Sequence, residues 1–276
     1  MTDMPASQGS SERAVEAPNL IVRSYRSLSR LLVRLADAPR YAHQGRNPVL
    51  PISLIFYALV ILALILLAQV MQYVDGDLSR AARAFGSDHR SVRSFFMLIT
   101  KLGSTLWILI PTLLIGLTLS VLDWSKGEVG RVRRLAGWYT DINFIFFTVL
   151  ISGLLAYFIK NTIGRARPKY LDLLGHDYFD FGAFQSGFAS FPSGHSTTFG
   201  AFCMGLALLF PRYNRILLAA ALLGGLSRVM VGAHYLSDVL AGLAFGAGLV
   251  WVSARYLARR DLMFRFRGGL MPVRKR

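Results

Sequence analysis

Three short segments of the sequence carry side chains that together could bind a phosphoryl group and attack it. Residues 160–168 hold cations, residues 192–195 hold a serine and a histidine around a glycine, and residues 227–238 hold an arginine, a histidine and an aspartate. Cations and N–H donors stabilise phosphoryl charge, and an imidazole can act as nucleophile or acid. Each segment lies at the end of an apolar run, so the fold must bring the three together.

The first segment sets Lys160 and Arg167 seven positions apart. Gly164 between them permits a turn, and Pro168 prevents a helix from continuing, so both cations can fold over one small anion. The alternative is that both are interfacial side chains that extend toward lipid headgroups. Under either interpretation the two cations lie just outside an apolar segment.

The second segment, Pro192-Ser193-Gly194-His195, precedes an apolar helix expected from about Ser196. The first N–H groups of a helix have no partner within it and readily bind anions. Ser193 and the Gly194 backbone are therefore predicted to bind phosphate, with His195 beside them. Alternatively, Ser193 only caps the helix and His195 is a hydrogen-bonded interfacial histidine.

The third segment contains Arg228, His234 and Asp238. Positions four apart share a face of a helix, so the Asp238 carboxylate is expected to accept a hydrogen bond from one ring nitrogen of His234 while the other nitrogen faces the site. That arrangement makes the imidazole a competent nucleophile or base, and Arg228 supplies a third cation. The alternative is that the pair only stabilises the start of the helix.

A metal site is the competing interpretation, because two histidines and an aspartate can bind zinc. The lysine and three arginines in the same segments argue against it, since a divalent cation would have to share a small pocket with them. We therefore expect no metal and no cofactor. The single cysteine, Cys203, lies inside an apolar run and is expected to be buried.

The composition places these segments in a membrane. Hydrophobic residues make up 54% of the 276 positions and charged residues only 17%. Several apolar runs approach the ~20 residues that a spanning helix needs. The predicted fold is an all-α, polytopic membrane helical bundle with six transmembrane helices. They are expected at about 49–70, 95–122, 142–159, 196–210, 216–231 and 235–252.

The spans define three regions. Residues 1–48 form a cytoplasmic N-terminal segment with a basic amphipathic helix at about 20–37, which lies on an anionic membrane surface or packs on a partner helix. Residues 49–255 form the six-span domain, in which 78–85 is a short interfacial helix, and residues 256–276 form a basic cytoplasmic tail. The net charge of +16 does not indicate nucleic-acid binding, because the arginines border apolar runs instead of alternating with aromatics in a polar domain.

The basic residues also predict the orientation. Most of the 31 lysines and arginines fall in the two terminal segments, the loop at 123–140 and the turn at 212–215. Basic loops stay in the cytoplasm, so both termini are predicted to be cytoplasmic and all three segments to lie on the external face. The aromatic-rich residues 170–191 on that face could border a lipid entry path or pack as an interfacial belt.

With these spacings the three segments resemble the three-part signature of the type 2 phosphatidic acid phosphatase family, whose bacterial members are integral membrane lipid phosphatases. The resemblance covers about residues 95–255. It implies that the substrate phosphate is bound by Lys160, Arg167, Ser193, Gly194 and Arg228. It also implies that His234 is the nucleophile that forms a phosphohistidine, that Asp238 orients it, and that His195 protonates the leaving alcohol. A place in the bacterial inner membrane follows from the same resemblance.

The expected activity is that of a metal-independent membrane phosphatase that hydrolyses a lipid phosphate or diphosphate at the external face. A lipid-to-lipid phosphotransferase would use the same histidines and pass the phosphoryl group to an alcohol. A non-catalytic membrane transporter or binding protein is the second alternative, although it would not require both histidines. Vanadate-dependent haloperoxidases resemble this family but are mostly soluble, which six spans disfavour. The expected partners are the bilayer and its phosphorylated lipids, with no nucleic acid.

The expectation about the substrate rests on the number of cations. Arg165 adds one to the three that the signature requires, which suits a diphosphate or a second phosphate on the headgroup; alternatively, Arg165 is an interfacial anchor. The resemblance suggests undecaprenyl diphosphate, phosphatidylglycerol phosphate, phosphatidate and lipid A phosphate. A site that opens to the bilayer would favour long-chain lipids over water-soluble phosphates.

Overall fold

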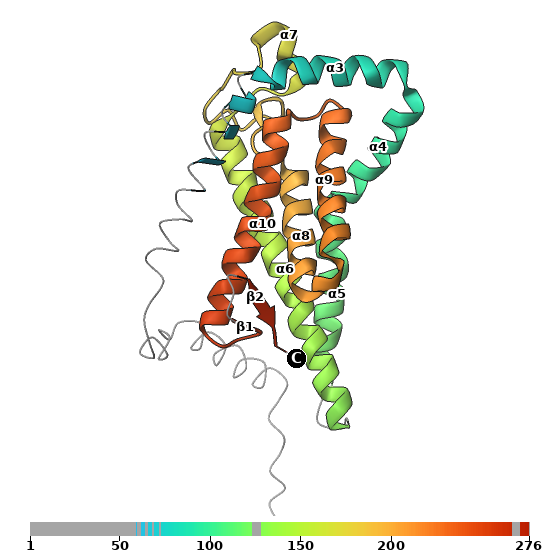
Figure 1. Ribbon diagram of the computed structural model, residues 1–276, viewed down its shortest axis with the longest axis vertical. Helices are drawn as coiled ribbons and strands as arrows, with labels where there is room; N and C mark the ends of the chain where they lie inside the picture. Colours follow the sequence, from blue (N-terminus) through green and yellow to red (C-terminus); the bar gives the residue numbers. More distant parts are fainter. Residues whose placement is uncertain are drawn as a thin grey trace, which may run out of the picture. The chain divides into compact units, whose positions relative to one another are not determined.

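The computed structural model describes residues 73–122, 128–266 and 271–275, together with scattered positions between 59 and 71. The predictions for residues 1–48, including the amphipathic helix, and for most of the first span lie outside these residues. The described part is mainly helical (Figure 1). Its helices are α3 Asp75–Asp88, α4 Arg90–Leu102, α5 Leu106–Val121, α6 Val129–Ile163, α7 Leu171–Leu174, α8 Gly194–Leu209, α9 Asn214–Met230 and α10 Leu236–Arg259.

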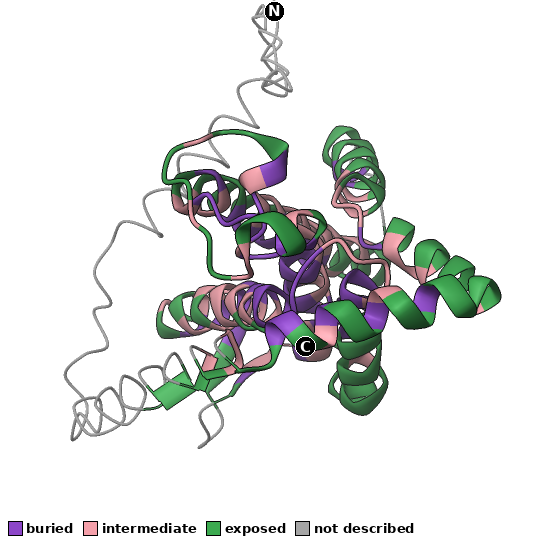
Figure 2. Cartoon of the chain, turned by 90° about the horizontal axis from the view of Figure 1, so that it is seen from above, coloured by how far each residue is buried: buried purple, intermediate pink, exposed green. Residues whose placement is uncertain are grey.

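Helix α8 is the centre of the packing, with α6, α9 and α10 against it. Figure 2 shows the buried residues gathered toward the centre of the described helices and the exposed ones on the outer sides. Helices α8 and α10 approach so closely that two glycines are required. A Cβ on Gly200 would lie 2.3 Å from the Leu243 carbonyl oxygen, and one on Gly246 would lie 2.1 Å from that of Thr197. Small residues permit such close packing of membrane helices, which fixes the ends of α8 and α10 relative to each other.

The outer surface is apolar, as a lipid-facing surface must be. Trp107 and Leu114 on α5 and Phe158 on α6 are each more than half exposed. Among the described helices, three apolar stretches are long enough to cross a bilayer: Arg90–Val121, Val129–Ile163 and Leu236–Arg259. Helices α8 and α9, with 16 and 17 residues, fall short of the roughly 20 residues of a typical span. The helical membrane bundle is confirmed, whereas the count of six spans is not.

Three predicted elements differ in detail. The span expected at 142–159 is the inner part of the longer helix α6, which begins at Val129, within the predicted loop at 123–140. The helix expected at 78–85 is present as the inner part of α3. The span expected at 95–122 is divided into α4 and α5, which are separated by residues 103–105. Gly103 lies at this break against the ring of Phe199, where an added Cβ would be 2.4 Å from a ring carbon. Close packing on α8 therefore accompanies the interruption, which hydropathy alone did not reveal.

The C-terminal residues correct the all-α prediction. Strand β1, Phe264–Phe266, pairs antiparallel with β2, Pro272–Arg274, in the region expected to be only a basic tail. Phe264 is fully buried, and its ring centre lies 5.0 Å from that of Phe144 on α6. Arg274 donates to both carboxylate oxygens of Asp141 on α6, at 2.7 and 2.6 Å. The described part of this tail is docked on the bundle because it has its own buried aromatic residue and a two-point ion pair.

Candidate active site

The first segment lies at the end of α6, with Lys160 in the last turn of that helix. Gly164 then adopts a left-handed conformation with φ of 65°. A Cβ on Gly164 would lie 1.7 Å from the Asp180 carbonyl oxygen, so only glycine fits this turn. Beyond it, the Arg167 amide donates to the Gly187 carbonyl at 3.0 Å, which holds this end of the segment in place.

The second segment forms the start of α8. Ser193 is the N-cap, and its Oγ accepts from the amide and the hydroxyl of Ser196, at 3.4 and 3.0 Å. The capping role considered for Ser193 is therefore present, and the Ser193 hydroxyl hydrogen can still donate to a phosphate. Gly194 and His195 are the first two residues of α8, so their amides have no carbonyl partner within the helix. Capping and anion binding are compatible here.

Backbone hydrogen bonds join the three segments. The Ser193 amide donates to the Asp238 carbonyl at 3.0 Å, and the Ser190 amide donates to the Arg165 carbonyl at 3.1 Å. The charges of four groups also act on His195, namely those of Arg228, His234, Lys160 and Arg167. The structure thus brings the three predicted segments together where α6 ends, α8 begins and α9 passes into α10.

His234 and Asp238 of the third segment lie close together, but not in the way that was predicted. His234 precedes α10, which begins at Leu236, so His234 and Asp238 do not share a face of one helix. The Nδ1 atom of His234 lies 2.9 Å from the Ser190 carbonyl oxygen and 3.6 Å from Asp238 Oδ2. The expected direct hydrogen bond to Asp238 is therefore replaced by one to the Ser190 carbonyl, with the carboxylate just beyond it.

The surroundings of His234 favour its neutral form. Burial lowers the pKa of His234 below its ordinary value of 6.5, although the nearby Asp238 acts in the opposite direction. A neutral imidazole that donates from Nδ1 to a carbonyl keeps its lone pair on Nε2. The Ser190 carbonyl thus selects the tautomer in which Nε2 can attack.

Arg165 is fully buried and all five of its N–H groups are engaged. Its Nη1 donates to Ser237 Oγ at 2.7 Å and to Asp238 Oδ1 at 2.6 Å. Its Nη2 donates to Asp75 Oδ2 at 2.9 Å, and Nη2 and Nε both donate to the His176 carbonyl, at 2.7 and 3.1 Å. Neither role considered for Arg165 fits, because it has no donor left for a second phosphate and no exposure to an interface.

Arg167 and Arg228 have the opposite surroundings. The guanidinium Nε of each is buried and has no hydrogen-bond partner among the described residues. Arg228 donates from Nη1 to Thr100 Oγ1 at 3.0 Å, so α4 also holds this side chain. Burial lowers the pKa of Arg167, which means that its charge is not fully compensated by the protein. Both side chains are therefore short of an anionic partner.

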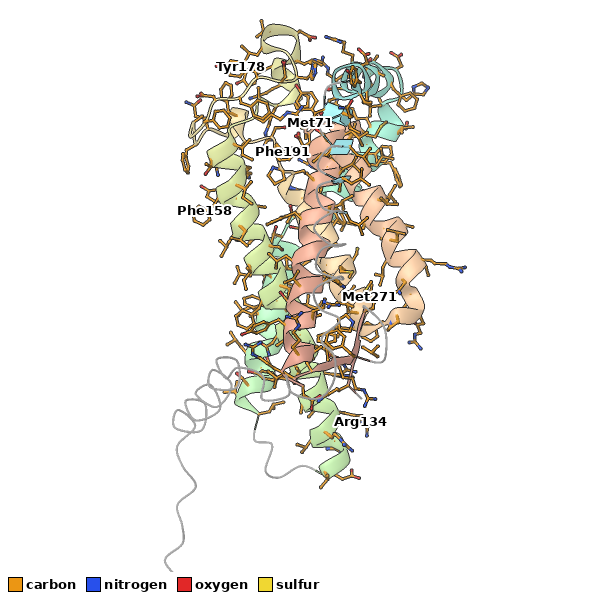
Figure 3. All side chains as sticks on the ribbon, turned by 60° about the vertical axis from the view of Figure 1, so that its left-hand side comes forward. Met71, Arg134, Phe158, Tyr178, Phe191 and Met271 are labelled. Carbon is orange, nitrogen blue, oxygen red and sulfur yellow. The ribbon has the colours of Figure 1, made fainter. Side chains whose placement is uncertain are left out.

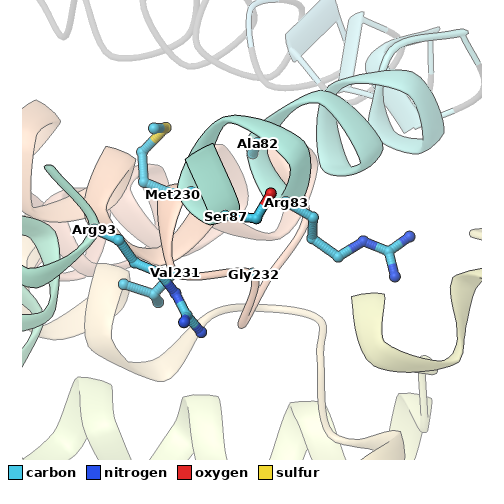
Figure 4. A pocket seen from close by; sticks show the side chains of 8 residues that line it. Ala82, Arg83, Ser87, Arg93, Met230, Val231 and Gly232 are labelled. Carbon is cyan, nitrogen blue, oxygen red and sulfur yellow. The ribbon is translucent and has the colours of Figure 1, made fainter. Parts of the chain in front are cut away.

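A cavity of about 200 Å³ adjoins the loop that carries His234 (Figure 4). It is lined by Ala82, Arg83, Gly86, Ser87, Arg93, Met230, Val231 and Gly232. Its walls come from α3, α4 and the turn after α9. Arg83 is already paired with Asp172, at 3.1 Å. None of the eight predicted site residues lines this cavity, so it is separate from the constellation described above.

Sequence reasoning missed three residues that hold the site together. Asp75 and Ser237 bind Arg165, and Ser190 binds both His234 and Asp238. Ser237 and Ser190 lie next to recognised motif residues, but their residue type alone is too common to signal a role. The sequence around Asp75 gave even less indication of a role in the site, because an acidic residue after an apolar run normally marks an exit from the membrane.

Comparison with known proteins supports the assignment of these residues to a family. The sequence model of the PAP2 superfamily matches residues 142–262. The lipid A 1-phosphatase of Rhizobium johnstonii is 43% identical over 189 residues, which cover 65% of this chain and 73% of the relative. That of Rhizobium etli is 41% identical over 198 residues, which cover 67% and 80%.

A solved structure shares the fold. The transmembrane PAP2-type phosphatidylglycerolphosphate phosphatase from Bacillus subtilis aligns with a TM-score of 0.51 over 72% of this chain and 94% of that one, at 24% identity. Phospholipid phosphatase 2 of Mus musculus is 28% identical over 155 residues, 45% of this chain and 55% of that relative. From the family match and the bacterial relatives, the chain belongs to the PAP2 superfamily, the type 2 phosphatidic acid phosphatases, and is a multi-pass membrane protein of that lipid phosphatase family.

Proposed function

We propose that the chain hydrolyses a lipid phosphate without a metal ion, through a phosphohistidine at His234. The observation that carries this proposal is the pair of buried Nε–H groups of Arg167 and Arg228, which have no partner among the described residues. Buried donors are nearly always paired, so these two favour an anion as their ligand. Beside them stands a neutral imidazole whose Nδ1 is already occupied by a carbonyl.

The phosphate would be bound by Lys160, Arg167, Arg228, the Ser193 hydroxyl and the Gly194 amide. His234 Nε2 then attacks phosphorus, the bond between phosphorus and the lipid oxygen breaks, and His195 gives its proton to the leaving oxygen. An anionic substrate favours the protonated form of His195 that this step needs. In the second step His195 takes a proton from water, the water oxygen attacks phosphorus, and the P–N bond breaks to release inorganic phosphate.

This scheme obtains its charge stabilisation from the protein. Fixed cations and N–H donors stabilise the three equatorial oxygens of the transition state. Within the described ranges, no three His, Cys, Asp or Glu side chains are placed to share a metal ion. The donor set, which consists of a lysine, arginines and amides, is one that prefers phosphate oxygens to metal ions.

The proposed substrate is a lipid A-type glycolipid that carries a 1-phosphate monoester. It is suggested by the two Rhizobium relatives, which are lipid A 1-phosphatases. Because Arg165 has no free donor, the number of available cations no longer favours a diphosphate. Phe181 and Phe184, which are 75% and 63% exposed, would lie at the membrane interface beside the acyl chains.

We place the site on the external face of the bacterial inner membrane, with both termini in the cytoplasm. Figure 3 supports this orientation, because Tyr178 and Phe191 of the aromatic segment lie at one end of the bundle and Arg134 in the basic first turns of α6 lies near the other. Cysteines at positions 89 and 176, in a Cys203→Ser background, should react with an impermeant reagent on spheroplasts, and one at position 128 should not. The reverse labelling pattern would overturn the orientation.

The direct test is phosphate release in detergent from lipid A, phosphatidate, phosphatidylglycerol phosphate and undecaprenyl diphosphate, with a short-chain phosphate ester as control. We expect the highest kcat/KM for lipid A, no effect of EDTA, and an acid-labile phosphoenzyme that is absent from His234→Ala. Loss of activity in EDTA with rescue by a divalent metal would contradict the mechanism. Transfer of phosphate to an added lipid alcohol instead of water would show a phosphotransferase.

A further inference from the structure

A buried network of charges links α3 to the candidate catalytic pair. Asp75, Arg165 and Asp238 are all fully buried. Arg165 lies between the two carboxylates, with Nη2 2.9 Å from Asp75 Oδ2 and Nη1 2.6 Å from Asp238 Oδ1. Asp75 is the first residue of α3, which lies outside the match to the family sequence model. Its contact with Arg165 therefore connects an element beyond the family match to the site.

Asp238 is held at both of its oxygens. Oδ1 accepts from Arg165, while Oδ2 accepts from the Ser190 hydroxyl at 2.6 Å and the Tyr235 amide at 3.0 Å. Oδ2 is also the oxygen that faces His234 Nδ1, at 3.6 Å. The carboxylate thus helps to hold Ser190, whose carbonyl oxygen lies 2.9 Å from His234 Nδ1.

Asp75 limits the number of Arg165 N–H donors that can bind Asp238. A guanidinium and a carboxylate prefer a two-point contact, in which both carboxylate oxygens are drawn to one cation. Here Asp75 occupies Nη2, and it is itself fixed by the Ser237 amide at 3.0 Å and by the Ser237 hydroxyl. Arg165 therefore offers only Nη1 to Asp238, which leaves Oδ2 free to face Ser190 and His234.

We propose that Asp75 and Arg165 are positioning residues for His234, which they orient through Asp238 and Ser190. This inference rests on the proposed function, because it assigns the network to the step in which His234 attacks phosphorus. It also connects α3 to the site through Asp75. In metal sites, residues that orient the ligands from outside typically contribute factors of about 10 to 100, and we expect a similar effect here.

The first test is Asp75→Asn, which keeps the shape of the side chain and removes its charge. We expect kcat on the preferred lipid to fall by about 10- to 100-fold with KM unchanged, because Asp75 acts on the nucleophile and not on substrate binding. The matched control is Asp77→Asn on the same helix, where the side chain is 86% exposed. The inference fails if the two variants have the same kcat.

The second test is a double-mutant cycle between Asp75→Asn and Arg165→Lys. Lysine keeps the charge but has no planar fork to share between two carboxylates, so Asp75→Asn should reduce kcat much less in the Arg165→Lys protein than in wild type. A purely structural role for Asp75 would lower the active fraction by the same factor in both backgrounds. Independent, multiplicative effects on kcat would therefore overturn the inference.

The same cycle measured by thermal unfolding does not depend on activity. The two substitutions disrupt one shared contact, so their effects on the unfolding temperature should also be less than additive. Should Asp75→Asn fail to fold, Ser237→Ala removes the hydroxyl that bridges Asp75 and Arg165 and takes its place in both cycles. A wild-type protein that releases phosphate from no lipid would contradict the proposed function, whereas additive unfolding effects would contradict the network.

Discussion

Arg165 and Arg167 stand two residues apart in one motif and have opposite surroundings. Arg165 is fully buried between two carboxylates and uses all five of its donors. Arg167 has a buried Nε without a partner among the described residues, as does Arg228 from the third motif. The comparison shows that the number of cations in a motif does not give the number available to a ligand. Availability depends on which N–H groups the fold has left unpaired.

The largest effect should come from removing the saturated cation. Arg165→Met leaves Asp75 and Asp238 as buried, uncompensated charges, and breaking such an ion pair costs about 3–5 kcal/mol. Because this is a large share of a protein's stability, we expect little folded protein in detergent, as measured by size-exclusion chromatography and thermal unfolding. The control is Arg215→Met, at an exposed arginine of α9. A wild-type unfolding temperature for Arg165→Met would contradict the structural role of the Arg165 ion pairs.

The cations with unpaired donors should behave in the opposite way. Arg167→Ala and Arg228→Ala remove groups that we propose bind the substrate phosphate, so each should lower kcat/KM by about 10²- to 10³-fold, the usual cost of losing one transition-state donor. The unfolding temperature of Arg167→Ala should stay close to that of wild type, because the folded protein does not pair its Nε atom. That of Arg228→Ala should fall only slightly, by the loss of its hydrogen bond to Thr100 Oγ1. Arg215→Ala is the control in both assays. A lowered unfolding temperature together with a wild-type kcat/KM in these variants would show that Arg167 and Arg228 stabilise the fold and do not bind substrate.

Binding of phosphate should distinguish Arg167 and Arg228 from the control arginine in an assay that does not need catalysis. Inorganic phosphate that binds only the folded state stabilises it, by about 2.7 kcal/mol at one hundred times its Kd. We expect phosphate to raise the unfolding temperature of wild type and of Arg215→Ala, and to have little effect on Arg167→Ala or Arg228→Ala. Equal shifts in all four proteins would show that phosphate binds elsewhere.

The smallest effect concerns the pH at which His234 becomes charged. Burial lowers the pKa of His234, so its neutral, nucleophilic form should persist as the pH falls below 6.5 and be lost only at lower pH. Spectra of ¹⁵N-histidine-labelled protein can follow this titration, because only five histidines are present and His234→Gln identifies the signal. Titration of His234 at or above pH 6.5 would contradict the buried, neutral nucleophile.

Much of the site could be predicted because its residues are local in sequence. A glycine that can adopt a left-handed turn, followed closely by a proline, favours the end of a helix at residues 164–168, and Ser193 favours the start of one, so local backbone chemistry places these motifs at helix ends. The prediction failed for the route between His234 and Asp238, since it assumed one helix through both positions. It also failed for the C-terminal strands, because a three-residue strand with one buried aromatic side chain has no distinctive pattern.

The amino-acid sequence by itself determined the membrane class, the three motifs and the chemical types that they contribute, because composition and local helix signals do not depend on distant contacts. Only the tertiary structure decided which arginines keep a donor without a partner among the described residues, since Asp75 reaches Arg165 across 90 residues of chain. It likewise decided that a backbone carbonyl, that of Ser190, binds the Nδ1 atom of His234. A hydrogen-bonding group is saturated or left unpaired by its neighbours in space, and no spacing within a motif specifies those neighbours.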